Sequence, residues 1–134
     1  MFKLIKILNR GTNVPEPIRL NKGARAIVRG EAFVLTGGKV TSPSATTLPT
    51  HIALCEADAD DTTAICAQIC PEMVFECPVK DGTPSSLVVG NKVCLALEGG
   101  SALGVNTTTT SGVATVYDTL GATNIGDKIL ITFR

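Results

Sequence analysis

Short runs of alternating apolar and polar residues, separated by pairs of glycines, dominate the pattern of this chain. Residues 30–35 begin with a glycine, continue as an apolar strand-like run and are followed by Gly37-Gly38. Residues 90–95 and Gly99-Gly100 repeat this order about sixty residues later. Glycine adopts the positive φ that a two-residue hairpin loop requires, so each copy predicts a β-hairpin.

Both copies of the pattern then continue in the same way. A Ser/Thr-rich stretch leads to an alternating run at residues 51–55 in the first copy and 112–117 in the second, and each copy ends on a further apolar run, at 64–69 and 128–133. Alternation with a period of two is typical of β-strands, and an element order that recurs along the chain is typical of a duplicated unit. The pattern therefore predicts an all-β domain, a small barrel built from two related β-meander halves.

The middle of the chain supplies one more strand and a boundary. Residues 73–79 alternate, and residues 80–84 combine Asp, Gly and Pro in a strong turn signal. Residues 63–69 carry a weak helical period, but Pro71 would interrupt a helix there, so we expect a strand. We therefore expect a β domain over residues 24–134, with possible halves 24–80 and 85–134.

The N-terminal residues 1–23 are expected to form a strand or an extended arm. The apolar run at 2–8 is too short, and Lys6 interrupts it, for a signal peptide or a membrane span. The prolines that follow favour extended backbone. If the segment is an arm that docks on a neighbouring subunit, its partner-binding residues are Phe2, Leu4, Ile5, Ile7, Val14, Pro15 and Pro17. The alternative is that it forms the first strand of the same barrel.

The balanced charge of the chain argues against a nucleic-acid partner. Lys and Arg number 12, Asp and Glu number 12, and the formal net charge is zero. A nucleic-acid-binding surface is normally basic, so we expect no nucleic-acid partner. With no apolar segment long enough to cross a bilayer, we also expect no membrane partner and a chain that is made in a cytoplasm.

The five cysteines predict buried thiols rather than disulfides or a zinc site. Their number is odd, no secretion signal precedes them, and no Cys-x-x-Cys pair occurs. Cys55, Cys66 and Cys94 lie in apolar strand-like runs, where a free cysteine behaves as a small hydrophobic residue. Cys70 and Cys77 flank a turn, and we expect them to be the exposed pair.

No group of residues has the spacing of a catalytic or metal site. His51 is the only histidine, and Cys55, four residues further along a strand, would lie more than about 10 Å away at about 3.3 Å per residue. We expect His51 to be a surface or edge residue. The acidic residues between 56 and 61 lack the glycine and the bidentate glutamate of a calcium loop, so we expect a solvated loop. We predict no catalytic residues, no metal and no cofactor; the chain is not expected to be an enzyme.

Several segments together resemble a known family. Residues 26–35 with 37–40, then 48–54 and finally 126–131 are similar to the small phage capsid decoration (cement) proteins. That family shares a glycine-acid-x-apolar-x-leucine strand, a Gly-Lys-Val hairpin and a Pro-Thr-Gly-Ile-Ala strand. The resemblance covers most of the chain after about residue 24. The chain departs from the pattern at His51, where the family prefers glycine, and in its long, Cys-rich middle.

The resemblance implies a structural protein of the virion. Such a protein would be a β-barrel or β-tulip-like domain on the outer surface of an assembled phage capsid, would bridge major capsid protein subunits and would stabilise the shell. It implies a homo-oligomer, with a trimer favoured, and no active site. The alternative is another β-rich phage appendage or binding module: a head-fibre base, a tail component or a glycan-binding domain. The small number of aromatic residues argues against the glycan-binding version.

Overall fold

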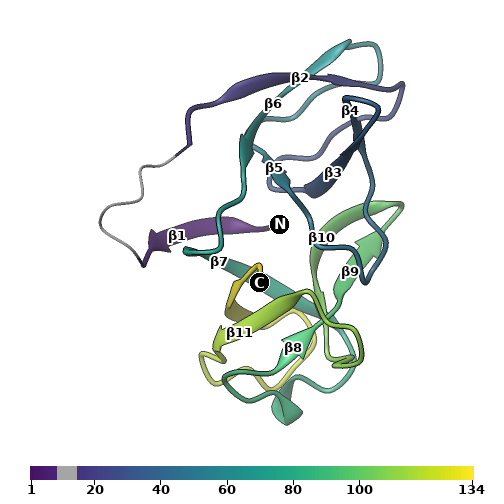
Figure 1. Ribbon diagram of the computed structural model, residues 1–134. Coiled ribbons are helices and arrows are strands. Elements are labelled where there is room, and N and C mark those ends of the chain that lie inside the picture. Colours follow the sequence, from purple (N-terminus) through teal and green to yellow (C-terminus); the bar gives the residue numbers. More distant parts are fainter. Residues whose placement is uncertain (9–14) are drawn as a thin grey trace.

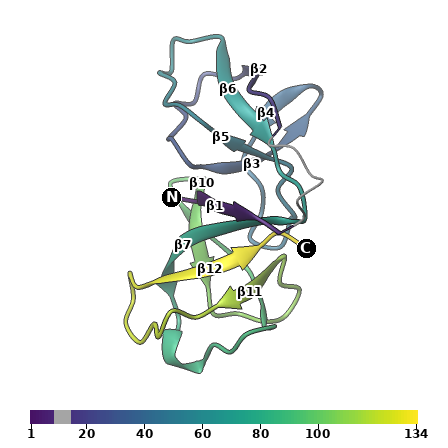
Figure 2. The same ribbon diagram turned by 90° about the vertical axis from the view of Figure 1, so that its left-hand side faces the viewer.

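The protein is almost entirely β-structure in the computed structural model, which describes residues 1–8 and 15–134 (Figures 1 and 2). Strands account for 47% of the residues and helix for 2%, so the all-β prediction is confirmed. The elements are β1 (Lys3–Ile7), β2 (Ile18–Lys22), β3 (Ala32–Thr36), β4 (Lys39–Thr41), β5 (His51–Ala53), β6 (Thr63–Gln68), β7 (Met73–Asp81), the short 3-10 helix η1 (Pro84–Ser86), β8 (Lys92–Val93), β9 (Leu95–Glu98), β10 (Ser101–Asn106), β11 (Ala114–Asp118) and β12 (Lys128–Thr132).

Strands β2 to β6 form a closed five-stranded barrel, which we call barrel one and which lies at the top of Figure 1. Strand β2 pairs with β6, β6 with β5, β5 with β3, and β3 with β4, all antiparallel. Parallel pairing between β4 and β2 closes the ring.

Strands β7 to β12 repeat this set of pairings and form barrel two. Strand β7 pairs with β12, β12 with β11, β11 with β8, and β9 with β10, all antiparallel. Strand β10 pairs parallel with β7, as β4 does with β2. Only Cys94 separates β8 from β9, and these two strands together take the position of β3. The two halves thus have the same set of strand pairings, as the repeated sequence pattern predicts. Each half also contains a parallel pair, which a simple β-meander lacks.

The turns that precede β3 and β8 show the duplication at the level of single hydrogen bonds. In both the 28–31 turn and the 88–91 turn, the N–H of the fourth residue donates to the carbonyl of the first at 3.1 Å. In both, the side chain of the fourth residue accepts the N–H of the first, also at 3.1 Å. The third residue is a glycine with positive φ, and its N–H donates to Ala53 in barrel one (2.9 Å) and to Val116 in barrel two (2.8 Å).

The two predicted glycine hairpins are confirmed. Gly37 and Gly38 join β3 to β4 with φ values of 56° and 75°, and Gly99 and Gly100 join β9 to β10 with 56° and 86°. Two consecutive residues with positive φ define the tight hairpin turn that matches the twist of the flanking strands. Glycine adopts this conformation without steric cost, which explains why both loops use it twice.

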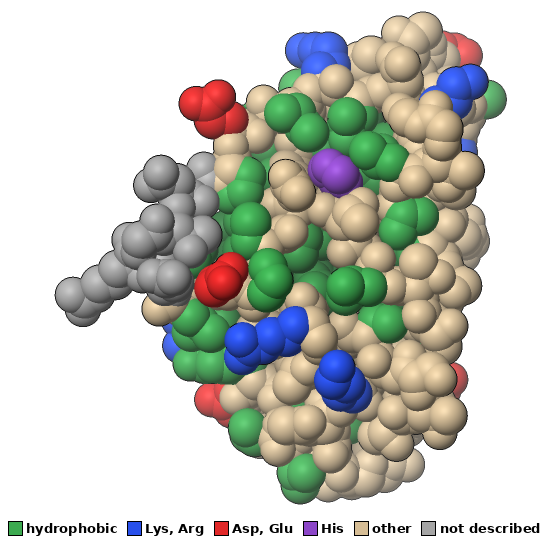
Figure 3. Space-filling view, viewed as in Figure 1, with side chains coloured by type: hydrophobic (Ala, Val, Ile, Leu, Met, Phe, Trp, Pro, Cys, Tyr) green, Lys and Arg blue, Asp and Glu red, His purple; other side chains and the backbone are tan. Residues whose placement is uncertain are grey.

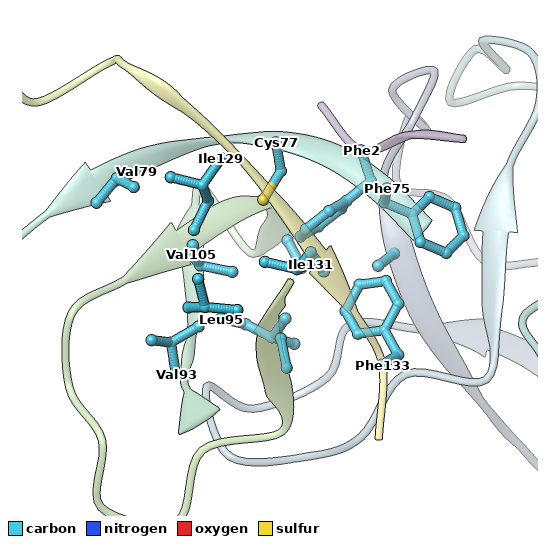
Figure 4. Packing of buried hydrophobic residues seen from close by; sticks show 14 of the residues in the cluster. Phe2, Phe75, Cys77, Val79, Val93, Leu95, Val105, Ile129, Ile131 and Phe133 are labelled. Carbon is cyan, nitrogen blue, oxygen red and sulfur yellow. The ribbon is translucent and has the colours of Figure 1, made fainter. Parts of the chain in front are cut away.

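The buried apolar residues form two clusters of unequal size. The smaller cluster fills barrel one around Phe33 and Cys66. The larger cluster fills barrel two and continues into the layer that faces barrel one (Figure 4). At that end three rings meet: Phe133 lies 5.1 Å from Phe2 and 5.3 Å from Phe75, measured between ring centroids. The barrels therefore share buried surface, and the N-terminal residues contribute to it.

The structure changes two expectations about the organisation of the chain. The described parts of residues 1–23 lie in two different strands: β1 pairs antiparallel with β7, and β2 is a strand of barrel one. The strand pairings divide the halves at residues 69–72, between β6 and β7, and not at the 80–84 turn. That turn ends β7, which already belongs to barrel two. A strong turn signal marks the end of a strand, whichever unit the strand belongs to.

Candidate binding groove

An apolar groove of about 440 Å³ lies between β1 and barrel one. Both views place β1 between β7 and the strands of barrel one (Figures 1 and 2). We call this hollow the β1 groove. All of its described lining residues except Lys3, Arg29 and Gly30 are apolar. The groove is lined by Met1, Phe2, Lys3, Leu4, Pro15, Pro17, Arg29, Gly30, Ile52, Ala53, Leu54, Ala67, Met73 and Phe75.

The register of β7 creates the position that β1 occupies. On one edge of β7, β10 pairs only with Val79 and Asp81, so residues 73–76 of that strand remain for β1. Two backbone hydrogen bonds fix the ends of the segment: Leu8 N donates to Glu72 O, and Phe2 N donates to Gly30 O, each at 2.9 Å. The second bond joins the edge of the segment that faces away from β7 to the 28–31 turn of barrel one.

The structure places the proposed partner-binding residues in different environments. Phe2 is buried in the core of its own chain and is not free to anchor a partner. Leu4 and Ile5 are exposed, whereas Ile7 packs against the core. Leu4, Pro15 and Pro17 line the β1 groove. Val14 lies outside the described residues. The segment therefore combines both interpretations of the sequence, since it is a strand of its own domain and it still presents apolar side chains on the surface.

The charged residues of the groove are all cations. Lys3 and Arg29 line it, and no Asp or Glu is among the lining residues that the structure describes. Neither cation forms an ion pair with a described residue; Glu76, which is opposite Lys3 in the register, instead pairs with Lys128 at 3.2 Å. Figure 3 shows hydrophobic side chains gathered on this face, with Lys and Arg side chains and an acidic side chain beside them. The arrangement suits a ligand that is apolar and carries negative charge.

His51, the only histidine of the chain, is held by contacts that position its ring within the sheet. It lies in β5 and pairs with Phe33 on one side and Gln68 on the other, so it is not at a sheet edge. Its ring stacks on the Phe33 ring at 5.7 Å, and its Nδ1 lies 2.8 Å from Thr50 Oγ1. Partial burial lowers the pKa of the imidazole below its ordinary value. Stacking and the hydroxyl contact account for its position.

The thiols are distributed differently from the prediction. Cys66 and Cys94 are buried as expected, but Cys77 is buried and Cys55 is exposed, the reverse of what the sequence suggested. Cys70 is half-buried. Burial raises the pKa of Cys66 to about 11 and also raises the pKa values of Cys77 and Cys94. The raised pKa values favour the protonated form of these three thiols at neutral pH.

The acidic loop forms a turn that uses its own carboxylate. Asp61 Oδ2 accepts the N–H of Asp58 at 2.8 Å, and both residues are exposed, so the predicted solvated loop is confirmed. Among residues 1–8 and 15–134, no group of three or more His, Cys, Asp or Glu side chains is arranged to hold a metal ion.

The sequence contained only part of the signal for the groove. Ile52, Ala53 and Leu54 line the groove in succession, whereas the alternation of residues 51–55 places Ala53 on the opposite face from its two neighbours. Arg29 appeared as a turn residue, and nothing local to it indicates that it approaches Lys3. These residues meet because β1 returns to β7 and barrel one packs above it.

Comparison with known proteins adds no family to this description. No protein-family model matches the chain, and no curated protein matches it. Within the described residues, no helix has the length and apolar character that a bilayer crossing requires.

Proposed function

We propose that the protein is a structural component of a phage virion that binds the outer surface of the assembled capsid and stabilises it by bridging major capsid protein subunits. The resemblance of residues 26–40, 48–54 and 126–131 to capsid decoration proteins motivates the choice of partner. The proposal includes a homo-oligomeric state, with a trimer favoured.

The β1 groove is the observation that supports a binding role most directly. Apolar side chains that line an open hollow of about 440 Å³ are stabilised when a ligand removes them from water. Beside the groove runs β1, whose only strand partner among the described strands is β7. An edge strand next to apolar walls is a surface at which proteins recognise extended polypeptide segments.

Co-sedimentation with assembled phage shells that lack their decoration protein tests the proposal. We expect saturable binding, weaker binding to unassembled capsid subunits, and a higher temperature of shell disruption. The stoichiometry at saturation distinguishes trimer, dimer and monomer. Absence of binding to any shell that is tested would contradict the proposal and favour a tail or appendage module.

A matched pair of variants locates the binding surface. Leu4 in the groove and Leu35 on β3 are each 37% exposed, so an aspartate at either position introduces the same charge at equal exposure. We expect L4D to weaken shell binding at least tenfold and L35D to bind like the natural protein. Equal binding by the two variants would place the contact elsewhere on the molecule.

A further inference from the structure

We propose that Asp81 and Gly82 form a site of spontaneous covalent modification, at which the aspartate rearranges to isoaspartate through a cyclic imide. Asp81 is the last residue of β7, and Gly82 follows it in the turn that leads to η1. The reagents are the next residue of the same chain and water. The site would therefore be modified whether or not the protein binds a capsid.

The Asp81 carboxylate is held against the nitrogen that would attack it. Gly82 N–H donates to Asp81 Oδ1 at 2.8 Å. Because Cγ is bonded to that oxygen, the Gly82 nitrogen lies about 3–4 Å from Cγ, and reacting atoms about 3–3.5 Å apart are in a near-attack geometry. Among the described residues, Gly82 N–H has no acceptor other than this carboxylate, so strand pairing does not hold it back.

Solvent reaches both residues, and the glycine leaves room for the ring to close. Asp81 and Gly82 are exposed, so water can accept the amide proton and can later open the imide. Glycine carries no side chain that would crowd the new bond between its nitrogen and Cγ. A bulkier residue is excluded at position 82 in any case, because its Cβ would collide with the Thr107 side chain and its φ would be 93°.

The proposed rearrangement conserves atoms and electron pairs. The Gly82 nitrogen loses its proton to solvent and forms a bond to Asp81 Cγ, and one oxygen of the protonated carboxyl group leaves as water. Hydrolysis of the imide then breaks one of two bonds. Cleavage of the new bond restores aspartate, whereas cleavage between the Asp81 carbonyl carbon and the Gly82 nitrogen gives isoaspartate. The main chain then runs through the former side chain and is longer by one methylene group, and nothing is oxidised or reduced.

Two other aspartates direct their carboxylates at amides that cannot close this ring. Asp118 Oδ1 accepts the N–H of Leu120 at 2.9 Å, two residues further along the chain. Asp61 Oδ2 accepts the N–H of Asp58 at 2.8 Å, three residues earlier. The imide forms only with the nitrogen of the directly following residue, which is the nitrogen that the Asp81 carboxylate contacts.

Isoaspartate at position 81 would weaken the end of the parallel pair between β7 and β10. Thr107 N donates to Asp81 O at 3.2 Å, and Thr83 N donates to Thr107 Oγ1 at 3.0 Å. The close approach of Gly82 to Thr107 leaves no room for a displaced main chain. We therefore expect both hydrogen bonds to break and the urea midpoint of the modified protein to fall by about 0.5–1 M.

Ageing of the purified protein for several weeks at physiological temperature and pH tests the proposal. An isoaspartyl methyltransferase labels the isoaspartate, and mass spectrometry of the digested protein locates the labelled peptide. We expect about tenfold more isoaspartate at position 81 than at Asp118, because only the first carboxylate contacts the nitrogen that follows it. No isoaspartate at position 81, or equal amounts at the two positions, would overturn the proposal.

A matched pair of variants assigns the modification to the ring closure. D81E keeps the carboxylate but has to close a larger ring, which forms more slowly, so we expect it to lose the methylation signal and to keep its urea midpoint on ageing. D118E is the control and should age like the natural protein. A signal in aged D81E as strong as that of the natural protein would contradict the assignment to Asp81.

A peptide of residues 76–86 separates the effect of the fold from that of the local sequence. Because the folded chain holds the nitrogen beside the carboxylate, we expect it to form isoaspartate at least as fast as the peptide. Slower formation in the folded chain would show that the fold protects the site and would overturn the proposal. Shell binding is measured on the unaged protein, so the proposed function and the modification can each fail without the other.

Discussion

Replacement of Arg25 by alanine should lower the stability of the protein, and the contacts of its side chain show why. Arg25 Nη2 forms an ion pair with Glu31 Oε1, and Arg25 Nη1 donates to Ser101 Oγ at 3.0 Å. The second carboxylate oxygen of Glu31 accepts the N–H of Val28 at 3.1 Å. Arg25 therefore connects the 28–31 turn of barrel one with β10 of barrel two.

Because Arg25 and Glu31 differ in exposure, we expect their removal to lower the free energy of unfolding by different amounts. The Glu31 side chain is 0% exposed and that of Arg25 is 33% exposed. In R25A the carboxylate stays inside without its cation, and we expect a loss of about 3–5 kcal/mol in the free energy of unfolding. In E31Q the volume and the bond to Val28 are retained while Arg25 still reaches water, so we expect a loss of about 1–2 kcal/mol. In R25A/E31Q the uncompensated charge is gone, and this double variant should be more stable than R25A.

Urea unfolding followed by circular dichroism measures these differences. With an m-value of about 2 kcal/mol/M, a loss of about 4 kcal/mol lowers the midpoint by about 2 M. The control is R19A, whose guanidinium is exposed and makes one hydrogen bond of 3.4 Å to Thr63, and which should lie within about 0.5 kcal/mol of the natural protein. An R25A variant no less stable than E31Q, or a double variant no more stable than R25A, would contradict a buried Glu31 carboxylate that depends on Arg25 for its counter-charge.

Four further outcomes follow from single residues. T132V should raise the free energy of unfolding by about 1 kcal/mol in urea, because the buried Thr132 hydroxyl has no hydrogen-bond partner among the described residues. L120N should raise it by about 0.5–1 kcal/mol in the same assay, because Leu120 is exposed and adopts a φ of 50°, which asparagine tolerates better. Iodoacetamide at pH about 8 should label Cys55 in the folded protein and leave Cys66 unlabelled until urea unfolds it, which mass spectrometry measures. The NMR titration midpoint of His51 should lie below that of the unfolded chain; because the folded state favours the neutral ring, its contribution to stability is present above the unfolded-state pKa and is lost as the pH falls through the folded-state pKa.

The duplicated topology was accessible from the sequence because its signals are local. Gly37-Gly38 and Gly99-Gly100 specify hairpins through backbone conformation alone, and alternation specifies the strands beside them. The parallel pairs β2–β4 and β7–β10 were not accessible. They join strands that do not follow one another, and no local pattern encodes such a partner.

Strand β2 was missed because its last inward position is a lysine. Ile18 and Leu20 alternate with polar residues as a strand should, but Lys22 is buried and interrupts the apolar pattern. Its ammonium donates to the carbonyls of Gly23 and Arg25, each at 3.1 Å. Hydrogen bonds to carbonyls allow a charged group to occupy a buried position that the hydrophobic pattern assigns to an apolar residue.

The burial of Cys77 and the exposure of Cys55 follow the alternation and the ends of the strands, not the distance of each cysteine from a turn. Phe75, Cys77 and Val79 occupy alternate positions of β7, and all three are buried in the larger apolar cluster. Strand β5 ends at Ala53, so the alternation that would bury Cys55 has already stopped at that residue. Within a strand, alternation determines which side chains point into the core. Beyond the last residue of the strand, that pattern no longer predicts burial.

The repeated sequence pattern does not predict the β1 groove, because the groove depends on a difference between the two halves. The halves share one set of strand pairings, yet β7 has nine residues and β2 has five. The greater length of β7 leaves residues 73–76 on one edge for β1, which carries Lys3 and Leu4 to barrel one. Duplication accounts for the barrels, and the departure from duplication creates the surface on which the proposed function depends. Shortening the pairing edge of β7 would therefore remove the groove while every pairing of barrel one remained.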